Sequence, residues 1–277
     1  MDALVSTAWL AGELGAADLV VFDATYYLPT EKKDGPALFL AGRIPGARFF
    51  DIGEIADPDT ALLHMVPTPG RFESLVRALG VSNTSRIVFY DQKGLQSAAR
   101  GWWMMGLFGH DQVAVLDGGL PKWVSERRAT ESGGITVPVA GSFVAAYRPT
   151  RLRGLGDMMA VDAGRVVLDA RAAGRFAGTA PEPRPGLPSG HMPGSRNIPS
   201  TSLLNPDGTM LPPETLRAMF AAQGADGTKP VVTSCGTGVT ATILTLGMVR
   251  AGLPIGAVYD GSWTEWAGRP DTIKETI

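Results

Sequence analysis

The sequence predicts an α/β protein with two tandem domains, each a parallel β-sheet flanked by helices on both faces. Three observations lead to this prediction. Short apolar segments rich in β-branched residues alternate with segments of helical spacing along the whole chain. The pattern occurs twice, and a stretch rich in Gly and Pro separates the two copies. Strands that alternate with helices form parallel sheets, because each helix returns the chain across a face of the sheet.

An internal repeat supports two domains and not one. Four short blocks of the first half return in the second half, in the same order and at a nearly constant offset. The pairs are 20–24 with 167–171, 41–48 with 189–196, 87–91 with 231–235, and 115–119 with 258–262. Two copies at such a long offset indicate a duplicated domain, since solenoid repeats are much shorter.

The predicted elements follow the same plan in both copies. In the first copy we expect strands near 19–23, 87–90 and 113–116, and helices near 6–15, 70–79, 96–108 and 119–127. In the second copy we expect strands near 166–169, 231–234 and 256–259, and helices near 213–223 and 239–251. The last of these helices is followed by Gly252 and Pro254, which are typical of a helix C-terminus.

These elements divide the chain into an N-terminal domain at 1–132, a linker at 133–155 and a C-terminal domain at 156–277. The linker lies within the segment 131–155, ESGGITVPVAGSFVAAYRPTRLRGL, which is rich in Gly, Pro and small residues. This composition is also typical of an extended strap that lies against one of the domains.

Composition limits the classes of function. The chain of 277 residues is 44% hydrophobic and 19% charged, so it can form a sizeable core. A net charge of −2 gives no basic surface for nucleic acid or an anionic membrane. Residues 1–22 lack the basic start of a secretory signal, and no apolar run reaches the roughly 20 residues that cross a bilayer. We therefore expect a cytoplasmic protein with neither nucleic acid nor membrane as a partner.

The single cysteine, Cys235, lies between the predicted strand 231–234 and the predicted helix that follows it. Gly236 and Gly238 allow a tight turn with positive φ and keep side chains out of the way, so that successive amides can point inward beside the positive end of the helix dipole. Such a loop binds anions, and a thiolate at Cys235 is the nearest one. Lone cysteines are often inert buried residues. The carboxyl end of a strand, however, is where open α/β sheets bind ligands, which favours a reactive thiol.

Two kinds of phosphate chemistry do not fit this loop. A phosphate-binding P-loop has Lys followed by Ser or Thr after its glycines, and neither follows here. A cysteine phosphatase has an arginine six residues after the cysteine, where this chain has Ala241.

The tandem copies, the block HMPGSRNIP at 191–199, the loop CGTGVTA at 235–241 and the block YDGSWTEW at 259–266 resemble those of two-domain rhodanese-type sulfurtransferases. The resemblance covers nearly the whole chain and is closest to 3-mercaptopyruvate sulfurtransferases. It implies that the first domain is catalytically silent. Asp91 occupies the position of the cysteine there, and a carboxylate cannot attack sulfur.

The resemblance further implies that Cys235 takes sulfur from 3-mercaptopyruvate as a persulfide and releases pyruvate. The sulfur would then pass to cyanide, to a small thiol or to a thioredoxin-like protein. The amides of Gly236, Gly238, Val239 and Thr240 would stabilise the terminal sulfur anion.

Arg175 and Arg184 match the two arginines that bind the substrate carboxylate and carbonyl in this family. A guanidinium suits a carboxylate because it donates two parallel hydrogen bonds. Considered without the resemblance, the same residues could equally form surface ion pairs.

Thr237 is expected to supply a proton to the leaving enolate. Some relatives are proposed to use a Ser-His-Asp relay, and Asp34 matches its aspartate. We place the histidine of that relay at position 43, where this chain has Arg43, which argues against a triad and leaves Arg43 at most a pairing with Asp34 or with the substrate anion. His64, in the segment HMVP, is interpreted as a loop-packing residue.

Two other functions remain open. A thiosulfate sulfurtransferase would have the same fold, although the neutral loop favours mercaptopyruvate because a dianion prefers cations nearby. A non-catalytic rhodanese-like binding module is the second alternative, and the intact Cys235 argues against it. No His/Cys cluster has the spacing of a metal site, so neither metal nor cofactor is expected.

Overall fold

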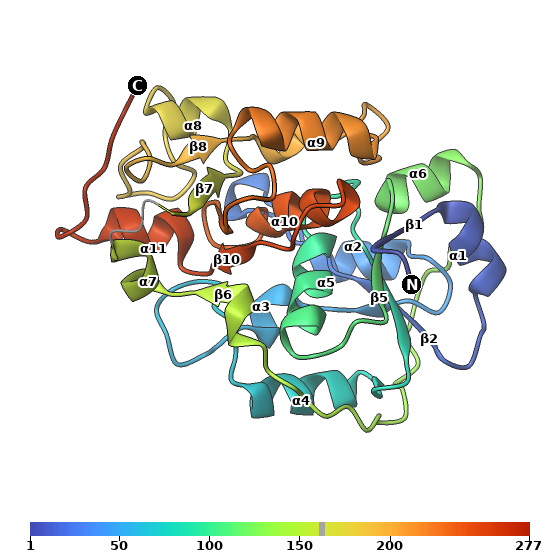
Figure 1. Cartoon of the computed structure of the whole chain (residues 1–277). Coiled ribbons are helices and arrows are strands. Elements are labelled where there is room, and N and C mark those ends of the chain that lie inside the picture. The colour runs from blue at the N-terminus through green and yellow to red at the C-terminus, as the bar shows by residue number, and fades with distance from the viewer. Residues whose placement is uncertain (161–163) are drawn as a thin grey trace. The chain divides into compact units, whose positions relative to one another are not determined.

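The computed structural model describes residues 1–160 and 164–277. The chain forms two compact units, each with a five-stranded, all-parallel sheet (Figure 1). Unit 1 consists of Met1–Pro58, Val66–Arg148 and Asn205–Met210, and unit 2 of Asp59–Met65, Pro149–Leu204 and Leu211–Ile277. The predicted linker 133–155 is thus divided between the units at residue 148.

The sheet of unit 1 has the strand order β1-β5-β4-β2-β3. Its strands are β1 (Leu4–Val5), β2 (Leu19–Asp23), β3 (Arg48–Phe49), β4 (Arg86–Tyr90) and β5 (Val113–Leu116). Its helices are α1 (Thr7–Glu13), α2 (Gly35–Ala41), α3 (Ile52–Ile55), α4 (Pro69–Ala78), α5 (Ala98–Leu107) and α6 (Gly119–Ser125).

The sheet of unit 2 has the equivalent order, β6-β10-β9-β7-β8, as a duplication requires. Its strands are β6 (Leu152–Arg153), β7 (Val166–Asp169), β8 (Arg196–Asn197), β9 (Val231–Ser234) and β10 (Ala257–Tyr259). Its helices are α7 (Leu155–Met159), α8 (Ala173–Ala177), α9 (Pro213–Ala222), α10 (Ala241–Arg250) and α11 (Ser262–Gly268).

Helices cover both faces of the unit 1 sheet, because alternate residues of a strand point to opposite faces. On β4, the ring of Phe89 points toward α5, where a Cβ on Gly101 would lie only 2.4 Å from it. The neighbouring Val88 and Tyr90 point the other way and pack with residues of α1, α2 and α6. Every residue of α5 is buried, so its Trp-Trp-Met-Met segment belongs to the core.

The unit 2 sheet is covered in the same way. On β9, the Thr233 hydroxyl lies 3.0 Å from that of Thr245 on α10. Its neighbour Val232 points to the opposite face and packs in a cluster with Trp263 and Trp266 of α11. The predicted fold class is therefore confirmed in both units.

All six predicted strands are present, and the four strands not predicted have only two residues each. So short a segment carries too little alternation to be recognised from the sequence. Of the seven described α-helices with at most seven residues, α1 and α6 were predicted and five were not, namely α2, α3, α7, α8 and α11. Helix α4 begins at Pro69 and is capped by the Thr68 hydroxyl, which accepts a hydrogen bond from the Arg71 amide.

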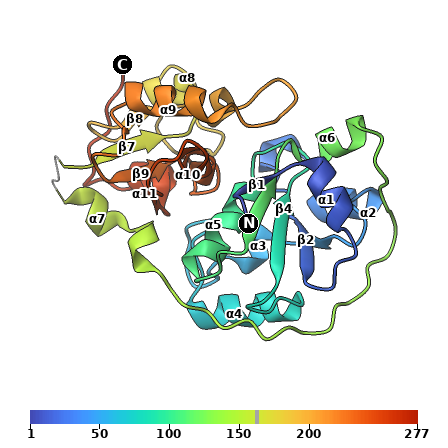
Figure 2. The ribbon, with the colours of Figure 1, turned by 45° about the vertical axis from the view of Figure 1, so that its right-hand side comes forward.

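The segment 133–148 lies along unit 1 as an extended strap, and Figure 2 shows it passing α4. Its backbone is attached by hydrogen bonds from the Gly141 amide to the Arg77 carbonyl and from the Phe143 amide to the Val81 carbonyl. Phe143 is fully buried and packs edge-on against Phe72 of α4. Burial of this one aromatic ring explains why a segment rich in small residues stays against the unit.

Candidate active site

Cys235 follows directly on β9, which lies between β10 and β7 in the unit 2 sheet. Helix α10 begins six residues later at Ala241, so the cysteine lies in a short loop between strand and helix, as predicted. The residue is only 2% exposed.

Ser262 holds this loop in place, and the sequence analysis did not single it out. Its hydroxyl oxygen accepts hydrogen bonds of 3.1 Å from the amides of Cys235 and Gly238, and it donates to the Tyr259 carbonyl. Ser262 has a φ of 50°, a conformation that is uncommon for residues other than glycine. The internal repeat could have pointed to Ser262, because the matching residue of the first copy is Gly119, whose φ is 56°. A serine in place of a glycine at a positive φ strains the backbone, and in unit 2 this strain accompanies a hydroxyl that holds the loop.

We expect Ser262→Ala to lower the free energy of unfolding by about 1–3 kcal/mol, because two buried amides lose their acceptor. Urea denaturation would measure this change. Ser262→Gly is the matched variant: it also lacks the hydroxyl but relieves the positive φ, so it should be more stable than the alanine variant by up to about 1 kcal/mol. Equal stability of all three proteins would show that the hydroxyl does not hold the loop.

The two glycines of the loop serve different purposes. Gly238 has a φ of 75°, as predicted. The prediction of a positive φ is wrong for Gly236, whose φ is not among the positive values. A Cβ at Gly236 would lie 3.3 Å from Arg175 Nη2 and 3.9 Å from Arg184 Nη1. The missing side chain therefore leaves room for Arg175, which would have to shift by a few tenths of an ångström to accept a Cβ there.

The loop amides form a donor surface beside the start of α10. The Gly238 amide is used by Ser262, which changes the predicted role of this group. The amides of Gly236, Thr237, Val239 and Thr240 donate to no acceptor in the described part of the chain. These four groups can therefore stabilise a thiolate or the outer sulfur of a persulfide.

Arg175 and Arg184 meet at this loop, as predicted from the sequence. Arg175, on α8, donates to Glu182 through Nη2 at 2.5 Å and Nε at 3.1 Å. Arg184 Nη2 is buried and has no hydrogen-bond partner among the described residues. A buried guanidinium nitrogen without a partner is costly, so a ligand anion at this position would satisfy it.

Glu182 connects Arg175 to a second, fully buried ion pair. Its other oxygen accepts a hydrogen bond of 2.7 Å from Arg171, which also pairs with Asp169 at 2.6 Å. Burial raises the pKa of the Asp169 carboxyl, and Arg171 opposes this rise. Burial alone would lower the pKa of Arg171, but the two carboxylates reverse this effect and raise it, which keeps the guanidinium charged. Asp169 therefore orders the wall of the site through Arg171 and Glu182.

His64 lies against the loop, which corrects its interpretation as a packing residue. The segment Asp59–Met65 belongs to unit 2, and His64 Nδ1 is 3.0 Å from the Thr237 hydroxyl oxygen. Both side chains are buried, and His64 has a φ of 63°. The histidine partner of Thr237 is therefore residue 64 and not position 43. The HMVP segment drew attention to His64 in the sequence. Because 173 positions separate His64 from Thr237, no local sequence pattern could show that their side chains are in contact.

Comparison with known proteins agrees with this geometry. The profile of the rhodanese-like domain matches residues 6–126 and 155–269. This chain belongs to the rhodanese family. It is 41% identical to thiosulfate/3-mercaptopyruvate sulfurtransferase 2 of Arabidopsis thaliana, over 98% of this chain and 85% of that protein. It is 42% identical to the 3-mercaptopyruvate sulfurtransferase of Rattus norvegicus, over 95% and 91% of the two chains. The crystal structure of SseA from Escherichia coli, described as a 3-mercaptopyruvate sulfotransferase, matches with a TM-score of 0.85 and 34% identity, over 95% of this chain and 99% of that one.

Asp34 and Arg43, the possible contributors from the first domain, do not pair with each other. Asp34 caps α2 and accepts a hydrogen bond from the Ala37 amide. Arg43 pairs with Glu131 at 2.7 Å and donates to the carbonyls of Gly133 and Gly134. Its guanidinium is thus fully used in holding residues 131–134 to unit 1.

The loop of unit 1 that corresponds to the Cys235 loop is closed around a carboxylate. One oxygen of Asp91 accepts hydrogen bonds of 2.7–2.9 Å from the amides of Gln96, Ser97 and Ala98, and the other accepts one from the Lys93 amide. The repeated fold therefore offers an anion cradle in both units. In unit 1 of the rhodanese it is occupied by a side chain that cannot carry sulfur.

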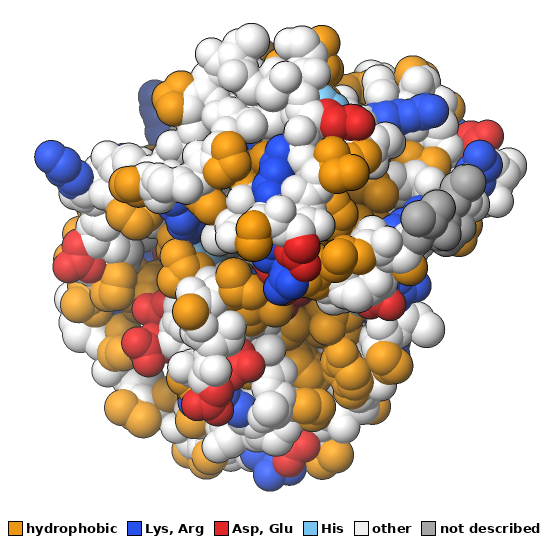
Figure 3. All heavy atoms as spheres, turned by 90° about the vertical axis from the view of Figure 1, so that its left-hand side faces the viewer, with side chains coloured by type: hydrophobic (Ala, Val, Ile, Leu, Met, Phe, Trp, Pro, Cys, Tyr) orange, Lys and Arg blue, Asp and Glu red, His pale blue; other side chains and the backbone are white. Residues whose placement is uncertain are grey.

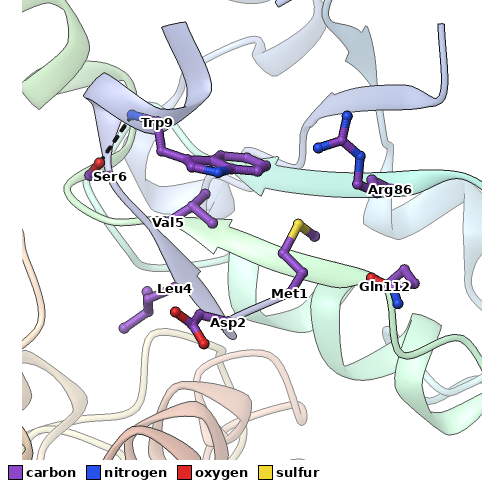
Figure 4. A pocket seen from close by; sticks show the side chains of 8 residues that line it. All are labelled: Met1, Asp2, Leu4, Val5, Ser6, Trp9, Arg86 and Gln112. Atoms are coloured by element: carbon purple, nitrogen blue, oxygen red, sulfur yellow. Dashed lines mark hydrogen bonds between the residues drawn. The ribbon is translucent and has the colours of Figure 1, made fainter. Parts of the chain in front are cut away.

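Unit 1 also has a pocket of about 460 Å³, shown in Figure 4. It is lined by Met1, Asp2, Leu4, Val5, Ser6, Trp9, Arg86 and Gln112. Gln112 and Arg86 lie at the amino ends of β5 and β4, away from the strand ends where this fold binds ligands. Asp18 and Glu13 pair with Arg86, so its charge is already balanced.

Other kinds of site find no support in residues 1–160 and 164–277. Among these residues, no group of His, Cys, Asp and Glu could hold a metal ion. No helix there has both the length and the apolar character that a bilayer crossing requires. On the face drawn in Figure 3, Lys and Arg side chains are scattered among acidic and hydrophobic ones, and the described residues form no continuous basic surface there.

Proposed function

We propose that this rhodanese transfers sulfur from 3-mercaptopyruvate to Cys235 and then to cyanide, a small thiol or a thioredoxin-like protein. One observation carries the proposal. The guanidinium groups of Arg175 and Arg184 lie beside Gly236, the residue next to the cysteine. A small 2-keto carboxylate bound by these groups would have its sulfur close to the thiolate.

In the first step, the Cys235 thiolate attacks the sulfur of the donor. A sulfur–sulfur bond forms and the carbon–sulfur bond of 3-mercaptopyruvate breaks, leaving Cys235 as a persulfide and pyruvate as its enolate. The enolate takes one proton and becomes pyruvate. The four loop amides stabilise the negative charge on sulfur before and after transfer.

The proton comes from the Thr237 hydroxyl in this proposal. His64 Nδ1, at 3.0 Å, replaces the proton that the hydroxyl gives up. In the second step the acceptor attacks the outer sulfur, and the thiolate of Cys235 is released. Cyanide leaves as thiocyanate, and a thiol leaves as a persulfide.

The charge beside the loop bears on the choice of donor. The residues of the loop are neutral, but two guanidinium groups lie against it, so a dianionic donor would also be attracted there. Thiosulfate is therefore a second candidate donor, and the Arabidopsis relative is named for both donors. A single net positive charge in the site favours 3-mercaptopyruvate, which is a monoanion.

The proposal is tested by intact-protein mass spectrometry after incubation with each donor. We expect one added sulfur on Cys235 with 3-mercaptopyruvate, and a kcat/KM for this donor at least about 100-fold above that for thiosulfate. Equal values of kcat/KM would place thiosulfate first. An unchanged mass with both donors would favour a non-catalytic binding module.

Replacement of either arginine tests substrate binding. We expect Arg184→Gln to lower kcat/KM for 3-mercaptopyruvate about 10- to 100-fold, because a charge-assisted contact with the carboxylate is lost. Arg175→Gln should act in the same direction. Alkylation of Cys235 by the neutral reagent iodoacetamide is the control and should change little. A parallel fall in alkylation would mean that the arginines only maintain the loop.

A further inference from the structure

A buried chain of alternating charges leads from the sheet of unit 2 to the Cys235 loop. Asp169 pairs with Arg171 at 2.6 Å, Arg171 with Glu182 at 2.7 Å, and Glu182 with Arg175 at 2.5 Å. The side chains of Asp169, Arg171 and Glu182 are at most 3% exposed, and that of Arg175 is 22% exposed. Charges this deeply buried are only weakly screened by salt, so each one matters at the donor site.

The charges of this chain cancel, but the charge of Arg184 does not. Two carboxylates face two guanidinium groups within the chain. No carboxylate among the described residues lies within ion-pair distance of Arg184, and its Nη2 has no hydrogen-bond partner there. The region around Gly236 therefore presents one uncompensated positive charge to a donor.

We propose that Glu182 is a specificity-determining residue that limits the donor site to one net positive charge and so favours a monoanionic sulfur donor over a dianionic one. The inference rests on the proposed sulfurtransferase function. 3-Mercaptopyruvate carries one carboxylate, whereas thiosulfate carries two negative charges close to its sulfur. With Glu182 neutralised, Arg175 would add a second positive charge, and the dianion would gain more from it than the monoanion.

Glu182 also sets the direction of Arg175. It accepts hydrogen bonds from Nε and from one N–H of Nη2, which leaves the second N–H of Nη2, the nitrogen beside Gly236, and both N–H groups of Nη1 for a donor. Charge and position are thus two separable effects of one side chain, and the test must distinguish them.

The test compares Glu182→Gln, which removes the charge, with Glu182→Asp, which keeps it. For Glu182→Gln we expect the ratio of kcat/KM for thiosulfate to that for 3-mercaptopyruvate to rise at least about 10-fold. For Glu182→Asp the ratio should stay within about 2-fold of the wild-type value, even if both constants fall. Glu214→Gln, an exposed position on α9, removes the same charge elsewhere in unit 2 and should leave both constants unchanged.

A second measurement does not depend on sulfur transfer. Iodoacetate and iodoacetamide alkylate the same thiol, but only iodoacetate is an anion, so their rate ratio reports the local charge. We expect this ratio at Cys235 to rise at least about 5-fold in Glu182→Gln and to stay unchanged in Glu214→Gln. Thermal unfolding checks the fold of each variant. In Glu182→Gln, the side-chain NH2 group can face guanidinium N–H donors, which would be destabilising. If that variant does not fold, Glu182→Met takes its place.

The outcomes separate this inference from the proposed function. The inference would be overturned if folded Glu182→Gln, or Glu182→Met in its place, kept the wild-type ratio of kcat/KM for the two donors and the wild-type ratio of the two alkylation rates. Equal impairment with both donors would then leave Glu182 as a positioning residue. A wild-type protein that forms no persulfide with either donor would refute the proposed function. The alkylation ratio would still decide whether Glu182 limits the charge at Cys235.

Discussion

Cys235→Ser is expected to lower kcat for sulfur transfer from 3-mercaptopyruvate by about 1,000-fold or more. A serine hydroxyl is not ionised near neutral pH, and it cannot form a persulfide. Pyruvate release during turnover measures the rate, and mass spectrometry of the variant should show no added sulfur.

The substitution should leave the fold intact, which makes the result interpretable. Serine is close to cysteine in size, and the loop is held by backbone hydrogen bonds to Ser262, Trp263 and Thr264 that do not involve the thiol. Thermal unfolding of the variant is the control. Turnover above a few per cent of wild type in a folded, purified variant would refute the role of Cys235 as sulfur carrier.

His64→Ala is expected to lower kcat for pyruvate release by about 100-fold, the lower end of the range for general acid catalysis. The loss arises because the Thr237 hydroxyl no longer has a group that returns its proton. Thr237→Ala should have an effect of similar size, and Thr237→Ser should restore activity because it keeps the hydroxyl.

Two comparisons show whether these residues act together. If His64 and Thr237 form one relay, the double variant should be no slower than the slower single variant. His191→Asn is the control, since His191 is also buried in unit 2 but hydrogen-bonds the Phe176 carbonyl and not the loop. A shared proton path would be contradicted if the reduction in kcat of the double variant equalled the product of the two single reductions. A wild-type kcat in His64→Ala would also contradict it.

The fold and the centre of the site could be predicted because their signals are local. The repeated strand–helix pattern specifies a parallel sheet in each half, and Cys235 lies directly between a strand and a helix. The roles of Arg175 and Arg184 came from the resemblance to rhodanese-type sulfurtransferases, because the residues by themselves could equally form surface ion pairs. Short edge strands and short helices were missed, since two to seven residues contain too little periodicity.

The errors concern residues whose role depends on a distant partner. His64 was read as packing and Arg43 as a neighbour of Asp34, because sequence shows neither the Thr237 hydroxyl beside the first nor Glu131 beside the second. A positive φ was predicted for Gly236 and is not present, whereas the space left by its missing side chain is next to Arg175.

The sequence by itself therefore determined the duplicated α/β fold and the loop that holds Cys235, and its resemblance to a known family pointed to the two arginines. The fold and the loop follow from residue types at short spacing, which local backbone preferences and side-chain chemistry control. Only the tertiary structure decided that Ser262 braces the loop, that His64 contacts Thr237, and that Glu182 neutralises Arg175. Hydrogen bonds and ion pairs act over a few ångströms in space, and the packing of the sheet and its helices alone sets which side chains come that close.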